Sequence, residues 1–241
     1  MSRSTLGETV KVKPAIACRS LSKSFGEPPS FAVKNATFSL ERGEFVALTG
    51  RSGSGKSTLL YMLSGLDKPS AGQVFLDGID IFEMESKEAH RFRNSNIGFV
   101  FQFHYLLPEL TAIENILMPA RKTDRHVAKR DDARRLLNEF GLEHCKDKFP
   151  SQMSGGEQQR TAIARALILD PIFLFADEPT GNLDTRNGDK AMEILKRINR
   201  ENGTTVVFVT HDPDYAALAQ RRIHMVDGEV NSDQIQTKNA R

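Results

Sequence analysis

The chain has 241 residues, of which 39% are apolar and 27% are charged, and these values predict one globular domain or one domain with an insert. A formal net charge of +2 is too small to favour nucleic acid as a partner, and the two cysteines, which show no metal-binding or redox spacing, are typical of a reducing cytosol. No apolar run approaches the roughly 20 residues of a membrane-spanning helix, and Met1–Val12 lacks the apolar core of a signal peptide.

The N-terminal part of the chain is predicted to be mostly strands, antiparallel at the front and parallel afterwards. Residues 1–14 are polar and predict a loose lead-in, and an edge strand is expected to begin at residues 15–18. Arg42-Gly43 predicts a hairpin-like turn and Asp77-Gly78 a tight turn. Apolar or alternating runs predict strands at residues 31–33, 36–40, 45–48, 73–76 and 97–101, with helices at residues 57–66 and 86–93.

The middle of the chain, from about residue 103 to 168, is predicted to be an all-helical insert. A 3–4 spacing of apolar residues predicts a helix over residues 131–140. Ser154 and Glu157 have the spacing of a capping box, in which each side chain bonds the backbone of the other residue. They therefore predict the start of a second helix in the insert.

The C-terminal part returns to strands. Residues 172–176 and 206–210 are unbroken apolar runs, which suit a parallel sheet covered on both faces. A helix is predicted between them at residues 187–202, and a last strand at residues 223–226. The polar tail from Asn231 is predicted to be frayed.

These elements predict an α/β fold in a single domain over residues 1–241. The core is expected at about residues 15–102 and 169–230, with an antiparallel β-subdomain at its N-terminal end and a mainly parallel sheet. The all-helical subdomain at about residues 103–168 interrupts it.

One stretch fits the phosphate-loop pattern G-x-x-x-x-G-K-[ST] at every fixed position, between a predicted strand and a predicted helix. Its glycines allow consecutive N–H groups to surround phosphate oxygens, and the helix N-terminus adds a positive dipole end. The lysine is expected to reach the β- and γ-phosphates of ATP, and the serine after it to bind Mg²⁺. A glycine-rich turn without a ligand is the alternative, which the flanking strand and helix disfavour. The candidate residues are Gly50, Arg51, Ser52, Gly53, Ser54, Gly55, Lys56, Ser57 and Thr58.

A second candidate site is the acidic pair that ends an apolar run, Asp177 and Glu178. A carboxylate at the end of a strand beside the phosphate loop can hold Mg²⁺, which is the role expected of Asp177. Glu178 is expected to accept a proton from the attacking water. For the pair alone, a solvated loop edge is an equal alternative, and the phosphate loop favours the catalytic interpretation.

Four further motifs resemble those of ATP-binding-cassette (ABC) ATPases and occur in the order usual for that family. Along the chain, Gln102 resembles the Q-loop, residues 153–160 the signature sequence, residues 181–184 the D-loop and His211 the switch histidine. The resemblance covers roughly residues 20–230 and implies the P-loop NTPase fold of that family. It also implies ATP hydrolysis with ATP and Mg²⁺ as cofactors.

The resemblance implies a head-to-tail dimer in which the phosphate loop of one copy faces the signature helix of a second copy. Gln102 would then touch Mg²⁺ or the attacking water, and His211 the γ-phosphate. Taken alone, His211 is more typical of an ordinary strand end, and Ser154 of a helix cap. The residues that the resemblance places at the partner's nucleotide are Ser154, Gly155, Gly156, Glu157 and Asp184.

Four positions depart from the family pattern. Met153 replaces the usual leucine with little change in volume, and Glu157 replaces the usual glutamine, a variant common in the family. At the adenine-stacking position, Phe25 is the better match for the usual tyrosine, and Phe31 stays open as the alternative. Arg51 stands where relatives often carry a small residue, and it has two open interpretations: added charge beside the phosphates, or contact with the partner's D-loop.

Residues 101–115 resemble the segment after the Q-loop in ATPases of the bacterial lipoprotein-releasing system, a branch that also holds macrolide-export and cell-division ATPases. The resemblance implies integral membrane permeases that dock near residues 102–115, lipoprotein cargo handled by the complex, and a peripheral position on the cytoplasmic face of the inner membrane. Export and cell division stay open as alternatives, while a non-transport ABC ATPase is disfavoured because the chain has neither heptads nor a second phosphate loop. The side chains expected to form a docking groove, unless they pack within the insert, are Phe103, Tyr105, Leu106 and Leu107.

Overall fold

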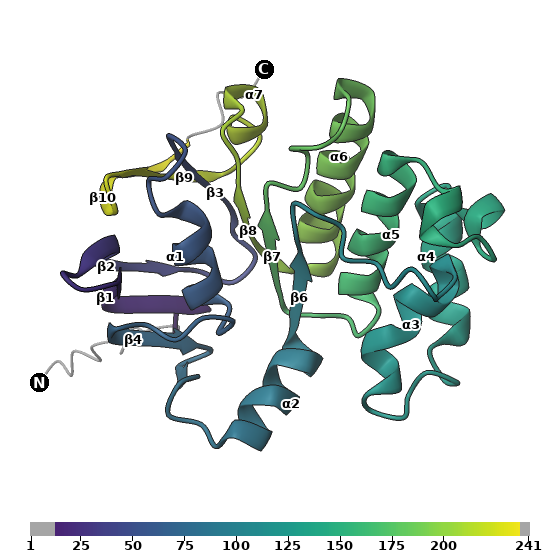
Figure 1. Cartoon of the computed structure of the whole chain (residues 1–241), viewed down its shortest axis with the longest axis horizontal. Coiled ribbons are helices and arrows are strands. Elements are labelled where there is room, and N and C mark those ends of the chain that lie inside the picture. The colour runs from purple at the N-terminus through teal and green to yellow at the C-terminus, as the bar shows by residue number, and fades with distance from the viewer. Residues whose placement is uncertain (1–12, 237–241) are drawn as a thin grey trace, which may run out of the picture.

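Residues 13–236 are described by the computed structural model, and they form two β-sheets with helices between and beside them (Figure 1). One sheet has four strands in the order β2-β1-β4-β5, and the other has six in the order β10-β9-β3-β8-β7-β6. Apart from residues 13 and 14, the predicted lead-in lies outside the described residues, and so does Met1–Val12, where no signal-peptide core is expected.

The four-stranded sheet is antiparallel, as the front of the chain predicted. β1 (Ile16–Phe25) pairs on one side with β2 (Ser30–Leu40) and on the other with β4 (Ala71–Leu76). The prediction of an edge strand at residues 15–18 is therefore wrong. β4 comes from much later in the chain and pairs with the second edge of β1, which sequence neighbours alone leave unpaired.

The two predicted turns have different outcomes. Asp77 and Gly78 have positive φ angles of 52° and 77°, and they form the predicted tight turn from β4 into β5 (Ile79–Asp80). The hairpin-like turn predicted at Arg42-Gly43 is wrong, because β2 and the next strand, β3 (Phe45–Gly50), lie in different sheets.

The six-stranded sheet contains the predicted parallel core. Five of its strands are parallel to one another. In order across the sheet they are β9 (Arg221–Val226), β3, β8 (Thr205–Val209), β7 (Phe173–Asp177) and β6 (Ile97–Val100). Every residue of β7 and β8 is buried, in keeping with their unbroken apolar sequences. Because the strands are parallel, the loops that follow β3 and β7 leave the same edge of the sheet.

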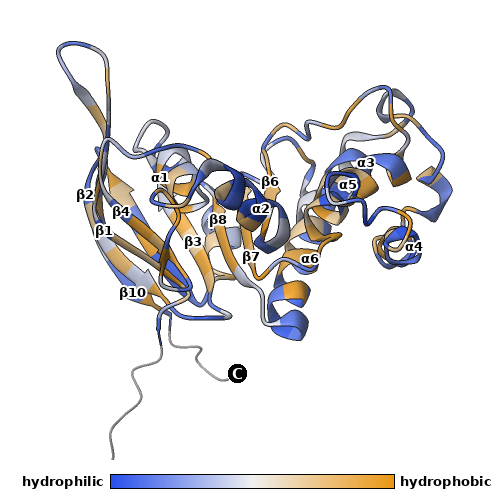
Figure 2. Ribbon diagram, turned by 90° about the horizontal axis from the view of Figure 1, so that it is seen from below, coloured by the Kyte–Doolittle hydropathy of each residue, from blue (hydrophilic) through white to orange (hydrophobic). Residues whose placement is uncertain are grey.

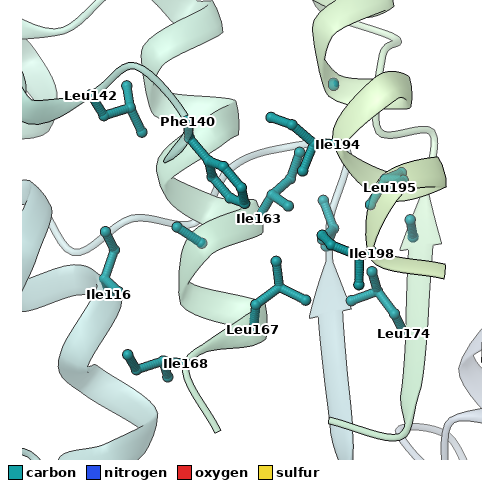
Figure 3. Packing of buried hydrophobic residues seen from close by; sticks show 14 of the residues in the cluster. Ile116, Phe140, Leu142, Ile163, Leu167, Ile168, Leu174, Ile194, Leu195 and Ile198 are labelled. Carbon is teal, nitrogen blue, oxygen red and sulfur yellow. The ribbon is translucent and has the colours of Figure 1, made fainter. Parts of the chain in front are cut away.

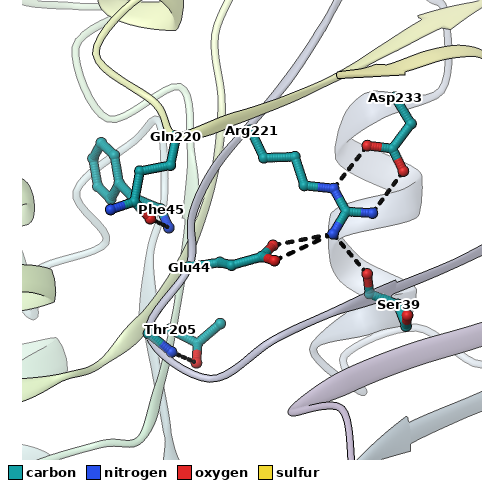
Figure 4. A network of polar contacts seen from close by, with 8 residues as sticks. Ser39, Glu44, Phe45, Thr205, Gln220, Arg221 and Asp233 are labelled. Carbon is teal, nitrogen blue, oxygen red and sulfur yellow. Dashed lines mark hydrogen bonds and ion pairs between the residues drawn. The ribbon is translucent and has the colours of Figure 1, made fainter. Parts of the chain in front are cut away.

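The tail of the chain is an ordered edge strand. β10 (Glu229–Ile235) pairs antiparallel with β9, so the frayed tail predicted from Asn231 is wrong as far as the described residues extend. Arg221 donates through Nε and Nη2 to the Asp233 carboxylate, both at 2.7 Å, and through Nη1 to the backbone oxygen of Ser39 at 2.8 Å (Figure 4). This contact ties β10 to the antiparallel sheet, an attachment that a polar sequence does not reveal.

The six-stranded sheet separates the core into two clusters, one on each face, and the helices cover both. α1 (Lys56–Leu63) lies between the two sheets (Figure 1), and its apolar side chains share a core with both. On the other face of the six-stranded sheet pack α5 (Gly155–Leu167) and α6 (Thr185–Asn202) (Figure 3). That second cluster includes Phe140, Ile163, Leu167, Leu174, Ile194, Leu195 and Ile198.

The remaining helices are short, and several have strongly polar faces. Figure 2 shows α4 mostly hydrophilic, in contrast to the hydrophobic strands β3, β7 and β8. Between β6 and β7 the described elements are all helical, and the exact limits of a helical subdomain stay a prediction. These elements are α3 (Ala112–Arg121), α4 (Arg130–Glu139), η1 (Glu143–Cys145), η2 (Pro150–Gln152) and α5, while α2 (Ser86–Asn96) precedes β6 and α7 (Pro213–Ala216) follows β8. Within residues 13–236, no helix has the length and apolar character to cross a membrane.

Candidate active site

The loop from β3 to α1 has a backbone that needs its glycines. Gly50, Gly53 and Gly55 have φ angles of 145°, 78° and 94°. A Cβ at Gly50 would collide with the carbonyl oxygen of Met225, and one at Gly55 with that of Ala32. The loop therefore adopts, against strands β2 and β9, a conformation that side chains at these positions would forbid.

The lysine of the loop is folded back into it. Lys56 is 6% exposed, and its Nζ donates to the backbone oxygen of Arg51 at 2.7 Å. Burial lowers the pKa of the Lys56 ammonium, and the nearby Glu178 and Asp177 carboxylates oppose that shift. The ammonium thus lies inside the loop with one carbonyl partner, positioned to exchange that partner for an anionic ligand.

Asp177, at the end of β7, joins the phosphate loop directly. The Ser57 hydroxyl donates to Asp177 Oδ1 at 2.8 Å, and the Tyr61 hydroxyl donates to Oδ2 at 2.6 Å. Burial and the hydrogen bond to Asp177 raise the pKa of Tyr61, so this donor keeps its proton. The Ser57 hydroxyl and the carboxylate are hard oxygen donors in contact with each other, which suits Mg²⁺.

Tyr61 was not among the residues predicted for the site. It lies one helical turn after Ser57 on α1, and residues four apart share a helix face. That spacing was the only sequence signal available. Without the pairing of β7 into the sheet, nothing in the sequence places the Asp177 carboxylate next to that face.

The three predicted catalytic side chains meet just beyond β7. Glu178 Oε2 lies 3.5 Å from Gln102 Nε2, which donates to it, and Glu178 Oε1 lies 3.4 Å from His211 Nδ1. Glu178 has a left-handed φ of 44°, so the chain turns sharply after Asp177 and the two consecutive carboxylates serve different neighbours. The Asn182 side chain donates to the Gln102 carbonyl at 3.0 Å and holds the Q-loop against the D-loop.

The signature residues open α5 with the predicted capping box. Glu157 N–H donates to Ser154 Oγ at 3.3 Å, while Glu157 Oε2 accepts from Ser154 N–H at 2.7 Å and from Ser154 Oγ at 2.9 Å. Burial would raise the pKa of Glu157, but hydrogen bonds from Ser154, His144 and Cys145 outweigh it and lower the pKa to about 2. The carboxylate is therefore a charged anchor for Ser154 at neutral pH. Sequence analysis missed His144 and Cys145.

Within one chain, the signature residues and the phosphate loop lie apart. In Figure 1 the loop before α1 is on the left of the molecule, whereas α5 begins on the right, beyond α6. The chain therefore does not close a site between Lys56 and Ser154 by itself.

Asp184 caps α6 and is linked to the signature helix through one further residue. Asp184 Oδ1 accepts from Asn187 N–H at 2.9 Å and Oδ2 from Asn187 Nδ2 at 2.8 Å. Asn187 Oδ1 in turn accepts from Arg160 on α5 at 3.1 Å. A Cβ at Gly156 would lie 2.5 Å from the Asn187 side chain, so the first turn of α5 packs directly on it. Sequence analysis missed Asn187, which carried no motif.

Both candidates for the adenine contact lie near the turn between β1 and β2. Phe25 is 54% exposed and Phe31 is 49% exposed, and Lys23 Nζ lies 5.2 Å from the centre of the Phe25 ring. Two exposed rings so close in the hairpin leave the choice between them open.

The segment after Gln102 presents apolar side chains on the surface. Phe103, Tyr105 and Leu107 are 62%, 63% and 38% exposed, while Leu106 is half-buried. Arg165 on α5 donates to the carbonyls of His104 at 2.8 Å and of Tyr105 at 2.6 Å. The segment is thus attached to α5 through its backbone, while the exposed rings of Phe103 and Tyr105 pack against each other on the surface.

Comparison with known proteins agrees with this layout. The family model for the ABC transporter domain matches residues 33–181, which contain the phosphate loop, the Q-loop, the signature and the acidic pair. The chain belongs to the ABC transporter family. It is accordingly an ATP-binding ATPase of the P-loop fold.

The chain is similar to ATP-binding proteins of lipoprotein-releasing systems over most of their length. The lipoprotein-releasing system ATP-binding protein LolD of Leptospira interrogans is 52% identical over 221 residues, which are 92% of each chain. A LolD protein of Chlorobium chlorochromatii is 51% identical over 203 residues, covering 83% of this chain and 82% of that one.

Solved structures show the same architecture. The ATP-binding cassette MJ0796, solved as a dimer in a post-hydrolysis state bound to ADP and Pi, superposes with a TM-score of 0.84 at 40% identity, covering 91% of this chain and 98% of that one. The cassette cbiO1 of Clostridium perfringens, part of the ABC transporter complex cbiONQ, gives a TM-score of 0.80 at 30% identity, covering 92% and 88%.

Proposed function

We propose that this chain is the ATP-hydrolysing subunit of a bacterial ABC transporter that releases lipoproteins from the inner membrane. The cargo rests on the 52% identity, over 92% of both chains, with a lipoprotein-releasing ATP-binding protein. The ATPase chemistry rests on a geometric observation: Gln102, Glu178 and His211 meet at the end of β7, beside the phosphate loop.

The phosphate loop of this chain receives the triphosphate. Lys56 leaves the Arg51 carbonyl for the β- and γ-phosphates, and the backbone N–H groups before α1 surround the phosphate oxygens. Ser57 and Asp177, already in contact, would hold Mg²⁺. The bound ion would neutralise charge that develops on the phosphate oxygens.

Glu178 acts as the general base. Its carboxylate accepts a proton from the water that attacks the γ-phosphate, and Gln102 orients that water. His211, 66% exposed in its side chain and in contact with Glu178, turns toward the γ-phosphate. The positive φ of Glu178 supports this role, because strained backbone conformations concentrate at catalytic positions.

The second half of the site comes from another copy of the chain. Ser154, Gly155, Gly156 and Glu157 at the start of α5, with Asp184 at the start of α6, would contact the nucleotide held by the partner's phosphate loop. The distance between α5 and the phosphate loop in one chain supports this arrangement, as does the dimeric cassette bound to ADP and Pi. A serine hydroxyl at a helix N-terminus is suited to an anionic γ-phosphate.

Membrane permeases dock on the segment of residues 102–115. Phe103, Tyr105 and Leu107 offer an exposed apolar surface there, and the Q-loop that precedes them contacts Glu178. The chain would thus sit on the cytoplasmic face of the inner membrane without entering it, and the complex, not this chain, would handle the lipoprotein.

The test is a comparison of two variants. Glu178→Gln is expected to keep ATP affinity, because the phosphate loop is unchanged. It should lose at least about 10²-fold in hydrolysis rate and accumulate as an ATP-bound dimer, because the general base is removed. Lys56→Ala is the matched control and should lose ATP affinity and remain monomeric. Size-exclusion chromatography with light scattering measures the dimer, and phosphate release measures turnover. Hydrolysis by Glu178→Gln near the wild-type rate would remove Glu178 as the base.

The cargo is tested separately. Affinity purification from detergent-solubilised membranes is expected to recover two permease subunits with large periplasmic domains. The recovered complex, reconstituted into liposomes with a bound lipoprotein, should release that lipoprotein on addition of ATP. Retention of the lipoprotein by an ATP-hydrolysing complex would contradict the lipoprotein function and leave the ATPase assignment intact.

A further inference from the structure

Three side chains beside the signature residues carry metal-binding atoms that point toward one another. A ring nitrogen of His144, Cys145 Sγ and a carboxylate oxygen of Glu157 all lie within 4.8 Å of one another. His144 and Cys145 belong to the η1 turn, and Glu157 belongs to the first turn of α5. We call these three residues the HCE cluster.

The HCE cluster is buried at Cys145, partly buried at Glu157 and open to solvent at His144. Cys145 is buried and forms no disulfide, and the Glu157 side chain is 17% exposed. The His144 side chain, by contrast, is 57% exposed and donates from Nε2 to Glu157 Oε1 at 2.7 Å. An ion could therefore enter from solvent past the His144 imidazole and reach the buried Cys145 thiol.

We propose that the HCE cluster binds one Zn²⁺ through His144 Nε2, Cys145 Sγ and Glu157 Oε1, with water as the fourth ligand. Tetrahedral Zn²⁺ with bonds of about 2.0 to 2.3 Å places its ligand atoms roughly 3.4 to 3.7 Å apart. His144 Nε2 and Glu157 Oε1 are 2.7 Å apart, and the three ligand atoms all lie within 4.8 Å of one another, so small rotations of the side chains would bring them to this spacing.

The chemistry of the donors selects the metal. Binding of Zn²⁺ would release the Cys145 thiol proton to solvent, and the resulting thiolate with an imidazole and one carboxylate favours Zn²⁺, whereas Mg²⁺ requires oxygen donors in an octahedron. The HCE cluster is thus chemically distinct from the Ser57–Asp177 pair, which offers only oxygen.

The position of the cluster gives its ion a direct link to the signature residues. Glu157 Oε1 faces His144, while Glu157 Oε2 holds both the N–H and the hydroxyl of Ser154. With Zn²⁺ on one oxygen and Ser154 on the other, the carboxylate would connect the ion to the capping hydroxyl of α5. The inference goes beyond the proposed function, since binding of Zn²⁺ requires neither ATP nor a membrane partner.

The test uses metal ions alone, with the whole chain and no nucleotide. Titration with Co²⁺, a spectroscopic substitute for Zn²⁺, is expected to give one equivalent of binding with a cobalt–thiolate charge-transfer band, and added Zn²⁺ should remove the band. Cys145→Ser should abolish the band. Cys18→Ser is the matched control, because Cys18 is also a buried free cysteine and lies far from the cluster, in β1.

A second variant guards against a folding defect in Cys145→Ser. His144→Ala removes an exposed side chain, should leave the circular-dichroism spectrum unchanged, and is expected to weaken Zn²⁺ binding by at least about tenfold in calorimetry. Two results would overturn the proposal. One is that the wild-type protein binds Co²⁺ without a thiolate band, and the other is that His144→Ala binds Zn²⁺ as tightly as the wild type. The three side chains would then be a hydrogen-bonded support for Ser154 and nothing more.

Discussion

The glycines of the phosphate loop differ in the room around them. Gly53 and Gly55 both have positive φ, 78° and 94°. A Cβ at Gly53 would have no heavy atom within 4 Å, whereas a Cβ at Gly55 would overlap the backbone oxygen of Ala32 in β2. Alanine at position 53 thus meets only conformational strain, while alanine at position 55 also pushes two elements apart.

This difference predicts unequal effects of two otherwise identical substitutions. Gly53→Ala is expected to lower the free energy of unfolding by about 1 kcal/mol, the usual cost of a side chain at positive φ. Gly55→Ala is expected to cost at least about 2 kcal/mol, because overlap with fixed backbone is added to that strain, and to lose ATP affinity. Urea unfolding and a fluorescent ATP analogue measure both. Equal losses in the two variants would show that the contact with Ala32 is unimportant.

At individual residues, spacing along the chain predicted which groups belong to the site but not what holds them. The fixed pattern around Lys56 and the acidic end of an apolar run were visible in the sequence. Tyr61, which donates to Asp177, was not, because its partner reaches it only through sheet pairing. The roles assigned to the individual site residues stay predictions.

Among the elements, α5 and α6 begin as one unit. Asn187 bonds Asp184 on its own helix and Arg160 on α5, and it lies under Gly156. The two helix starts that would face the partner's nucleotide are therefore joined by a single side chain. Asn187 is a positioning residue in this arrangement, because it touches neither nucleotide nor the reacting atoms.

Removing that side chain should separate binding from turnover. Asn187→Ala loses two side-chain hydrogen bonds, each worth about 1 kcal/mol, so ATP hydrolysis is expected to fall about 5- to 20-fold. ATP affinity of the isolated chain should stay unchanged, since Lys56 and the phosphate loop are untouched. Asn202→Ala, at the exposed end of the same helix, is the control and should match wild type. A loss of ATP affinity equal to the loss of turnover would contradict the positioning role.

The elements themselves were predicted unevenly, for physical reasons. β7 and β8 were correct because full burial requires unbroken apolar runs, and α5 because Ser154 and Glu157 supply its cap. β10 was missed, because its stability comes from pairing with β9 and from Arg221 rather than from apolar residues. The position of β1 was wrong, because sheet order depends on which distant strand arrives beside it.

For the whole molecule, the exposed segment after Gln102 predicts a defect confined to assembly. Phe103→Asp combined with Leu107→Asp should leave ATP affinity unchanged and prevent co-purification with membrane subunits, because charges would then face an apolar partner. Val127→Asp, at a 74% exposed position in the helical region, is the matched control and should co-purify normally. Normal recovery of the complex with the double variant would place the docking surface elsewhere.

The hydrogen bonds from Arg165 to the carbonyls of His104 and Tyr105 make α5 a rigid connection between Ser154 and the exposed segment. Ser154 stands at one end of this helix and Arg165 near the other, a span of about 16 Å at 1.5 Å per residue. Since the described helix contains neither proline nor a break, a displacement of Ser154 by the partner's nucleotide, if the proposed dimer forms, would reach the backbone of the exposed segment without a hinge between them. Under the proposed function, the length of α5 would then set how far a docked membrane protein moves when the nucleotide binds.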